Sequence, residues 1–337
     1  MPYRVSRRST IKLLLGAPLA AAGLPALVAA QSARATPGPF ATPVAVTPHL
    51  PVTVTDVNGK KVTVTDISRI VPLSGDIAEI IWDLGLGSHI VAVDVSATYP
   101  PQLQKLPSIG FEMQLSAEAI LKAKPTVVIG RPEASPASAL DQVRSAGVPL
   151  VIVAEPQSLA APTDKIREVA AALGVPAVGD TLAQEVQAQI NAALALAAKA
   201  TSKPVVMFLY VRSGGIQLIG GKGSVADIGI AAAGGIDAGT KAGITGFQPV
   251  TAEAMIAAAP DYIIVPLSGM ESVGGIAGVL KVPGVAETPA GKARRILAYD
   301  DLELLDLTPR TGQMLLTIVR AIHPELAEAS PVASPGA

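Results

Sequence analysis

The sequence contains no cysteine. This absence excludes disulfide bonds, thiolate metal sites, a cysteine nucleophile and attachment of a lipid to an N-terminal cysteine. Aromatic residues make up only 3% of the 337 residues, so the hydrophobic core must be built mainly from Ala, Val, Ile and Leu. The formal net charge is −1, which gives no sign of the positive charge that nucleic-acid binding requires.

Sequence patterns for catalysis and for nucleotide binding are also missing. No Gly-x-Ser-x-Gly motif occurs, and the glycine pairs at 214–215, 220–221 and 274–275 do not form a nucleotide-binding loop after a strand. The chain has three histidines, and we expect a structural role for each: His49, His89 and His323. These observations predict a protein that is not an enzyme. A site built on two carboxylates, or a structural or adhesive surface protein, remains an alternative.

The N-terminus is typical of an export signal over residues 1–35. Three arginines among the first eight residues precede an apolar stretch from Leu13 to Ala30, and small residues suited to cleavage follow at 33–35. The run Ser6-Arg7-Arg8-Ser9-Thr10-Ile11-Lys12 resembles a twin-arginine signal, which exports proteins already folded. An ordinary secretory signal and an uncleaved anchor are the alternatives. All three place the mature protein outside the cytoplasm, in the periplasm or on the outer face of the cytoplasmic membrane.

The segment between residues 52 and 327 alternates short apolar runs with helical patterns. This alternation predicts an α/β fold in which parallel sheets carry helices on both faces. A hairpin around Asn58-Gly59 is expected over 52–65. A Pro-rich spacer at 36–51 precedes this segment, and a disordered tail at 328–337 follows it.

One long helix is expected to divide the α/β segment into two lobes. Residues 179–202 have no proline and no internal glycine up to Thr201, and they are rich in Ala, Gln and Leu, which favours one continuous helix. The predicted organisation is an N-terminal lobe at 52–178, the connecting helix at 179–202 and a C-terminal lobe at 203–327. Such a helix would act as a stiff spine that allows only small movements of the lobes.

Two stretches of the chain have nearly the same sequence. Residues 115–130 read LSAEAILKAKPTVVIG, and residues 250–265 read VTAEAMIAAAPDYIIV. In each copy Ser or Thr is a predicted helix N-cap, and a glutamate, Glu118 or Glu253, falls in the first turn, where the helix dipole favours an anion. The repeat predicts two related lobes, each with one carboxylate at a matching position.

These features together resemble the helical-backbone class of substrate-binding proteins that serve ABC importers, also called class III. The resemblance covers nearly all of residues 52–325. In that class one glutamate on each lobe docks onto arginine pockets of the two permease subunits. The resemblance implies this docking role for Glu118 and Glu253, and a two-subunit permease as partner.

Several loops are similar to those of the haemin-binding members of this class. Tyr99-Pro100-Pro101 is similar to a loop shared by cobalamin-binding and haemin-binding proteins. Three segments of the C-terminal lobe favour haemin over cobalamin, ferric siderophores and other chelates: residues 269–276, residues 283–291, and Asp300-Asp301 before Pro309-Arg310-Thr311. The resemblance implies that the protein captures haem as transported cargo and delivers it to an importer.

The resemblance implies that Tyr99 binds the haem iron, because the family motif places its ligand there. A phenolate is a hard anionic donor that suits ferric iron, and Tyr99 follows a predicted strand at the sheet edge where ligands of open α/β sheets bind. Arg131 and Arg212 also follow predicted strands, and we expect them to contact the haem propionates.

The second axial ligand of the family pattern is missing from this sequence. Residues 130–135 contain no histidine, and Phe247 stands in the segment where other members have a ligating tyrosine. Phe247 is expected to stack on the macrocycle instead. Met270, in the predicted loop after a strand, is a further candidate for contact with the iron.

Overall fold

The computed structural model describes residues 46–155 and 157–326, and all of them belong to one compact unit. The predicted export signal at 1–35, most of the spacer at 36–51 and the tail at 328–337 lie outside the described residues. Val46 and Leu50, at the end of the predicted spacer, pack against the core that follows. The folded part therefore begins before residue 52.

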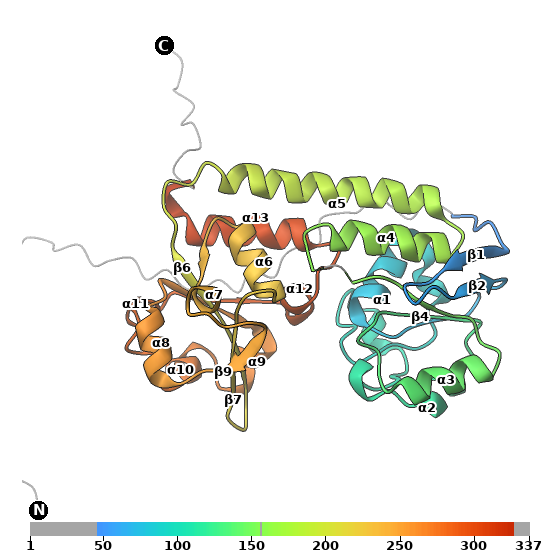
Figure 1. Cartoon of the computed structure of the whole chain (residues 1–337), viewed down its shortest axis with the longest axis horizontal. Helices are drawn as coiled ribbons and strands as arrows, with labels where there is room; N and C mark the ends of the chain where they lie inside the picture. Colours follow the sequence, from blue (N-terminus) through green and yellow to red (C-terminus); the bar gives the residue numbers. More distant parts are fainter. Residues whose placement is uncertain (1–45, 156, 327–337) are drawn as a thin grey trace, which may run out of the picture. The chain divides into compact units, whose positions relative to one another are not determined.

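The part of the chain before helix α5 (Pro176–Ala197) forms the N-terminal lobe (Figure 1). Its sheet has three strands in the order β3-β4-β5, and their pairing is parallel, as predicted. The predicted hairpin is confirmed, because β1 and β2 pair antiparallel on either side of Asn58-Gly59. The elements of this lobe are β1 (Val52–Thr55), β2 (Lys61–Val64), β3 (Ile70–Pro72), α1 (Gly75–Ile81), α2 (Ala117–Lys122), β4 (Val127–Gly130), α3 (Ala137–Ser145), β5 (Leu150–Ile152) and α4 (Ala161–Ala172).

The segment after α1 differs from a regular strand. Residues 90–93 meet the sheet only through an isolated bridge from Ile90 to Ile70, and Val93 bridges instead to Ser108. The backbone N–H of Val93 donates to Pro107 rather than to β3. This segment divides its hydrogen bonds between two neighbours, so no continuous ladder forms with either.

The part of the chain after α5 forms the C-terminal lobe, which has a mixed six-stranded sheet. Strands β8, β6, β10 and β11 pair in parallel, whereas β7 and β9 extend the sheet antiparallel. The expectation of a wholly parallel sheet is wrong for this lobe, because Gly214 and Gly215 both have positive φ and turn β6 directly back into β7. The elements are β6 (Val205–Arg212), β7 (Ile216–Gly220), α6 (Val225–Ala232), β8 (Ile236–Asp237), α7 (Ala238–Lys241), β9 (Phe247–Pro249), α8 (Ala252–Ala258), β10 (Tyr262–Pro266), α9 (Leu267–Ser272), α10 (Ile276–Val279), α11 (Pro289–Ala293), β11 (Ile296–Tyr299), α12 (Asp301–Leu305) and α13 (Thr311–Ile322).

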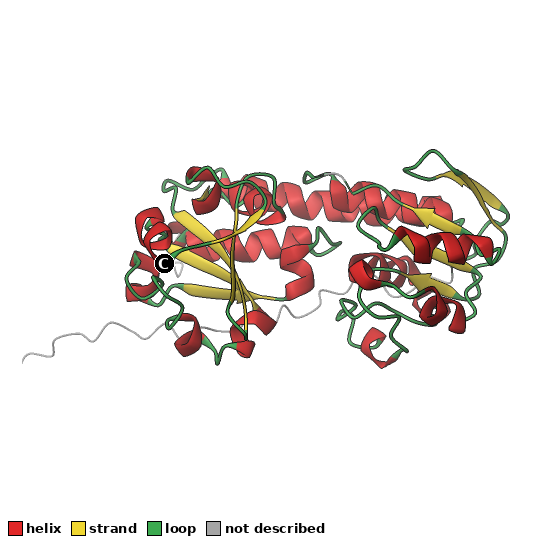
Figure 2. Cartoon of the chain, turned by 60° about the horizontal axis from the view of Figure 1, so that its bottom comes forward, coloured by secondary structure: helices red, strands yellow, loops and turns green. Residues whose placement is uncertain are grey.

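Each lobe buries apolar side chains on both faces of its sheet, and helices cover the strands on either side (Figure 2). In the N-terminal lobe Ile70 and Val71, which are neighbours in β3, enter two different core clusters. In the C-terminal lobe Phe208 and Leu209 of β6 do the same. This is the arrangement of a two-sided α/β sheet, and it explains why the strands read as continuous apolar runs.

The long helix α5 connects the lobes, as the sequence predicts. It begins at Pro176, three residues before the predicted start, because proline fits the first turn of a helix. It ends at Ala197, five residues before the predicted end at 202, where Thr201 and Ser202 are weaker helix formers than the residues of α5. Its 22 residues correspond to a length of about 33 Å.

Helices α4 and α13 pack against α5 at two points of close approach (Figure 1). A Cβ on Gly179 of α5 would lie 2.2 Å from the Ala170 side chain of α4, and a Cβ on Gly312 of α13 would lie 2.7 Å from the backbone nitrogen of Ile190. The spine is therefore a packed layer of helices from both lobes rather than a single free helix. Within the described ranges, no helix is both long enough and apolar enough to cross a membrane.

Candidate functional site

Tyr99 lies in a loop that Asp94 holds in place. The Asp94 carboxylate accepts hydrogen bonds from the backbone N–H groups of Ser96 at 2.6 Å and Glu112 at 2.8 Å. The Tyr99 ring is half-buried, and the guanidinium of Arg310 lies 3.9 Å from the ring centroid. The fold thus places the predicted iron ligand against a cation of the C-terminal lobe.

Arg310 joins the two lobes at this point. Its Nε and Nη2 donate to the Glu79 carboxylate of α1 at 2.9 and 3.0 Å, and its Nη1 donates to Glu303 of α12 at 2.5 Å. All three side chains are almost completely buried. Sequence reasoning used Arg310 only as part of a family motif and gave it no role at the site.

The groups around Tyr99 share a desolvated environment. Burial raises the pKa of the Tyr99 phenol and the charge of Arg310 opposes this rise. Burial also raises the pKa of Asp83 to about 8, with the charge of Glu79 as a second cause. Within the described residues, Asp83 Oδ2 and Thr98 Oγ1 are buried without a hydrogen-bond partner. The surroundings of Tyr99 therefore retain polar atoms that are not yet satisfied.

Arg131 follows β4, as the sequence predicts, but it is not a free cation. Its Nε and Nη2 donate to the Glu112 carboxylate at 2.9–3.1 Å, and its Nη1 donates to Asp306 of the C-terminal lobe. Asp76 of α1 lies 3.6 Å from the same Nη1. Sequence reasoning missed these partners because they are distant along the chain.

A buried lysine extends this network of ion pairs. Lys165 of α4 donates from Nζ to Asp76 at 2.5 Å and lies 2.9 Å from Glu155. Burial alone would raise the pKa of Asp76, but the charges of Arg131 and Lys165 hold it below its usual range. Burial raises the pKa of Glu155 to about 7, although Lys165 opposes the rise.

The turn from Asp306 to Arg310 in the C-terminal lobe contacts both residues that the sequence predicts for the site in the N-terminal lobe, Arg131 and Tyr99. Asp306 pairs with Arg131, and Arg310 lies over Tyr99. One short segment of the C-terminal lobe therefore contacts both Arg131 and Tyr99, through two side chains that lie four residues apart in the sequence. We regard this boundary between the lobes as the candidate ligand-binding site.

The predicted residues of the C-terminal lobe do not all lie together. Arg212, at the end of β6, donates to Asp301 at 2.7 Å and pairs with Ile216 at one end of β7. Phe247 pairs with Gly220, at the other end of β7. The structure therefore separates Arg212 from Phe247 along the strand. Phe247 is 41% exposed, and its ring meets that of Phe208 edge-on.

Met270 lies in helix α9 rather than in a loop. Its side chain is partly buried and packs against the core cluster of the C-terminal lobe. Arg212 is close to this helix, because a Cβ on Gly269 would lie 2.5 Å from Arg212 Nη1. Met270 is thus a neighbour of Arg212 in the fold.

Apolar side chains on two adjacent loops of the N-terminal lobe, which the sequence patterns did not indicate, are exposed. Phe111 and Met113 flank Glu112, the partner of Arg131, and both are about half exposed. Val95 is exposed as well, and its N–H donates to Gly110 beside them. Large exposed apolar side chains on adjacent loops are typical of a binding surface.

Two histidine side chains, those of His89 and His323, have structural partners, as expected. His89 Nδ1 lies 3.0 Å from the Ile67 carbonyl, and His323 Nε2 lies 2.9 Å from the Ala233 carbonyl. The backbone of His49 donates to Gly174. In the described part of the chain, no three His, Asp or Glu side chains are grouped in a way that could hold a metal ion.

The two repeats form the predicted helix starts. Ser116 accepts a hydrogen bond from Ala119 N at 3.4 Å in α2, and Thr251 accepts one from Ala254 N at 3.2 Å in α8. Glu118 and Glu253 both lie in the first helical turn and are exposed. Each lobe therefore presents one carboxylate to solvent at the start of an equivalent helix.

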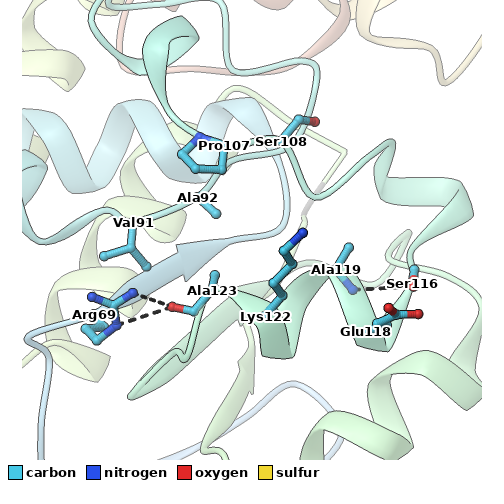
Figure 3. A pocket seen from close by; sticks show the side chains of 10 residues that line it. All are labelled: Arg69, Val91, Ala92, Pro107, Ser108, Ser116, Glu118, Ala119, Lys122 and Ala123. Atoms are coloured by element: carbon cyan, nitrogen blue, oxygen red, sulfur yellow. Dashed lines mark hydrogen bonds between the residues drawn. The ribbon is translucent and has the colours of Figure 1, made fainter.

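A pocket of about 520 Å³ lies beside Glu118 (Figure 3). Arg69 donates to the carbonyls of Ala123 and Lys124, which fixes the end of α2 along one side of the pocket. Tyr99 and Arg131 do not contribute to it. Its lining comprises Arg69, Val91, Ala92, Pro107, Ser108, Ser116, Glu118, Ala119, Lys122 and Ala123.

We predict that the protein becomes less stable as the pH rises through neutrality. Burial raises the pKa values of Glu79, Glu112 and Glu155 from 4.5 to about 7, so the folded protein keeps protons that the unfolded chain has already lost. The free energy of unfolding should therefore fall by several kcal/mol as the pH rises from about 4.5 to about 8, where Asp83 also loses its proton, and then level off.

Urea unfolding at a series of pH values measures this dependence. The variant Glu112→Gln should show a smaller fall in the free energy of unfolding. The variant Glu185→Gln, at an exposed position of α5, should show the same fall as the unchanged protein. A stability that is constant or rises over this range contradicts the assignment of these protons to the folded state.

Comparison with known proteins agrees with this architecture. The family described as periplasmic binding protein matches residues 70–302. The periplasmic haem-binding protein RhuT from Roseiflexus sp. RS-1, solved in its apo form, is 52% identical, with a TM-score of 0.75. That match covers 77% of this chain and 100% of the RhuT chain.

Two curated relatives match a smaller part of the chain. An uncharacterised ABC transporter substrate-binding lipoprotein, YvrC of Bacillus subtilis, is 28% identical over 144 residues, which are 42% of this chain and 46% of YvrC. The vitamin B12-binding protein of Vibrio campbellii is 28% identical over 142 residues, 42% of this chain and 50% of the relative. The matched region thus spans about half the length of these relatives.

The family match extends over more than half of the chain, and the fold is that of class III binding proteins. The protein is accordingly a binding protein rather than an enzyme, as the sequence predicts. The chain belongs to the periplasmic binding protein family.

Proposed function

We propose that this protein captures haemin outside the cytoplasm and delivers it to an ABC importer. The observation that carries the proposal is the position of Tyr99, half-buried at the lobe boundary beneath Arg310. The similarity to a haem-binding protein over that protein's whole chain supports it, and the similarity to an ABC transporter substrate-binding lipoprotein supports the importer as the destination.

Tyr99 binds the ferric iron through its phenolate oxygen. The phenol must lose its proton to do so, and the positive charge of the iron drives this loss. Arg310 assists, because a cation 3.9 Å from the ring centroid favours the phenolate, whereas the burial of the phenol opposes it. Once the iron is bound, its positive charge neutralises the phenolate, so burial no longer disfavours the deprotonated form.

The macrocycle lies against apolar side chains of both lobes. Phe111 and Met113 of the N-terminal lobe, and Phe247 of the C-terminal lobe, are exposed and have the flat or flexible shapes that cover a porphyrin face. Met270 contributes an apolar contact from helix α9. The two arginines predicted from the sequence, Arg131 and Arg212, bind the propionates. Each propionate replaces a protein carboxylate with which the arginine pairs in this structure.

The exposed glutamates bind the importer. Glu118 and Glu253 carry negative charge on separate lobes, which suits a permease made of two equivalent subunits with arginine pockets. Hydrogen bonds from its own backbone N–H and from Thr251 hold the pKa of Glu253 below its usual value, so this carboxylate is ionised at neutral pH. The pocket beside Glu118 leaves surface open for a permease side chain to approach (Figure 3).

Cobalamin is the second candidate ligand, since a vitamin B12-binding protein is among the relatives. The two ligands make different demands on Tyr99. Ferric haem offers an axial position that a phenolate fills, whereas cobalamin recognition does not require deprotonation of the phenol. Absorption spectra of the protein mixed with each compound separate the two candidates.

Replacement of Tyr99 by phenylalanine should remove iron ligation while it keeps the ring beneath Arg310. Bound haemin should lose the charge-transfer band typical of tyrosinate, and the affinity should fall about tenfold or more. Absorption titration measures both. Tyr262→Phe, in strand β10 of the C-terminal lobe, should bind haemin as the unchanged protein does, and a tyrosinate spectrum in Tyr99→Phe would remove Tyr99 from the site.

Replacement of both Glu118 and Glu253 by alanine should leave haemin affinity unchanged and reduce delivery. Loss of a charged contact at a docking interface should lower uptake by roughly tenfold or more. Haemin uptake by cells that carry the cognate importer and this variant measures the effect. Glu185→Ala serves as the control, and normal uptake with both docking carboxylates absent would contradict the docking role.

We propose export through a twin-arginine signal at residues 6–12, because Arg7 and Arg8 lie in the matching positions. Replacement of both by lysine should keep the charge and stop export, so that the protein accumulates in the cytoplasm. Cell fractionation measures this outcome. Normal export of the lysine variant would favour an ordinary secretory signal instead.

A further inference from the structure

The guanidinium of Arg131 divides its hydrogen bonds between the two lobes. Nε and Nη2 donate to Glu112, which lies in the same lobe and holds one edge of the guanidinium at 2.9–3.1 Å. Nη1 faces the other way and donates to Asp306, which belongs to the C-terminal lobe. The first contact fixes the orientation of the arginine, and the second depends on how the lobes meet.

Carboxylates outnumber cations around this arginine. Four acidic side chains (Asp76, Glu112, Glu155 and Asp306) surround two basic ones (Arg131 and Lys165), and Glu133 adds a more exposed carboxylate at 3.9 Å. Lys165 pairs with Asp76 and Glu155, so Arg131 is left to Glu112 and Asp306. Each carboxylate in this group is repelled by the neighbouring carboxylates and stays in place through its pairing with a cation.

Among the four carboxylates that surround the two cations, that of Asp306 is held least firmly by its neighbours. Arg131 is the single hydrogen-bonding partner of the Asp306 carboxylate among the described residues, and the Asp306 side chain is 13% exposed. Glu112, in contrast, is held by two nitrogens of the guanidinium. An incoming carboxylate would therefore displace Asp306 from Nη1 more readily than it would displace Glu112.

We propose that Asp306 is an internal substitute for a carboxylate of the ligand. The Asp306 side chain occupies Arg131 Nη1 until a carboxylate of the bound ligand replaces it. This inference rests on the proposed function, because the haem propionates are the carboxylates concerned. It makes Asp306 a competitor that lowers the affinity for ligands with carboxylates and leaves the affinity for ligands without them unchanged.

The exchange also couples binding to the contact between the lobes. Asp306 ties the C-terminal lobe to Arg131, and Arg310, four residues later, ties the same segment to Glu79. When the ligand takes Nη1, the first tie is released and the second is kept. Ligand binding thus loosens the boundary beside Arg131 without separation of the lobes at Tyr99.

The variant Asp306→Asn tests this competition with two porphyrins. Haemin carries two free propionates, and haemin dimethyl ester has the same iron and macrocycle without them. Because asparagine is uncharged and binds Arg131 less strongly, the affinity for haemin should rise about tenfold while the affinity for the ester stays the same. Absorption titrations in one detergent-containing buffer measure both, and thermal unfolding checks that the variant folds.

A second variant keeps the test valid if Asp306→Asn does not fold. Arg131→Gln removes the shared partner, so it should abolish the preference for haemin over the ester. Asp141→Asn is the matched control, since Asp141 pairs with Arg144 on the surface of a single lobe and should change neither affinity.

The possible outcomes separate this inference from the proposed function. An unchanged or weaker affinity of Asp306→Asn for haemin, or an equal gain for both porphyrins, would overturn the exchange while haemin binding itself stands. Failure of the unchanged protein to bind either porphyrin would overturn the proposed function and the exchange with it.

Discussion

Arg310 donates hydrogen bonds to carboxylates of both lobes while its guanidinium covers the ring of Tyr99. An arginine with so little exposed surface needs charged partners, because the desolvation of an unpaired guanidinium would cost several kcal/mol. Glu79 and Glu303 provide these partners only when α1 and α12 lie against each other. The pairing therefore fixes how the lobes meet, and with it the environment of the tyrosine.

The same boundary carries more carboxylates than cations. Glu79, Glu112 and Glu155 all have pKa values near 7, since burial favours their neutral form and the neighbouring carboxylates repel one another. A region of this kind is held together less firmly than an apolar contact of the same size. This suits a binding protein, in which the lobes must hold a shape without a ligand and rearrange locally when one arrives.

The spine restricts that rearrangement. Helix α5 packs against α4 of one lobe and α13 of the other, with glycines at the closest contacts. Asp306 and Arg310 lie just before α13, so the residues that reach Arg131 and Tyr99 are carried by a helix of the spine. Glu118 and Glu253, for which we propose a docking role, lie on the two lobes that this layer joins, and a stiff layer would keep both carboxylates available to one partner at the same time.

The sequence by itself determined the elements whose causes are local. Helix α5 follows from an uninterrupted run of good helix formers, the N-caps at Ser116 and Thr251 follow from one side chain and a backbone N–H three residues later, and the hairpin follows from Asn58-Gly59. The resemblance carried by the two predicted lobes, the long helix and the paired glutamates also gave the correct class of protein. Tertiary structure alone decided the charge environment of the site. Arg131 meets a carboxylate 175 residues away and Arg310 one 231 residues away, and no pattern of spacing specifies such pairs, because the folding of both lobes onto the spine brings them together.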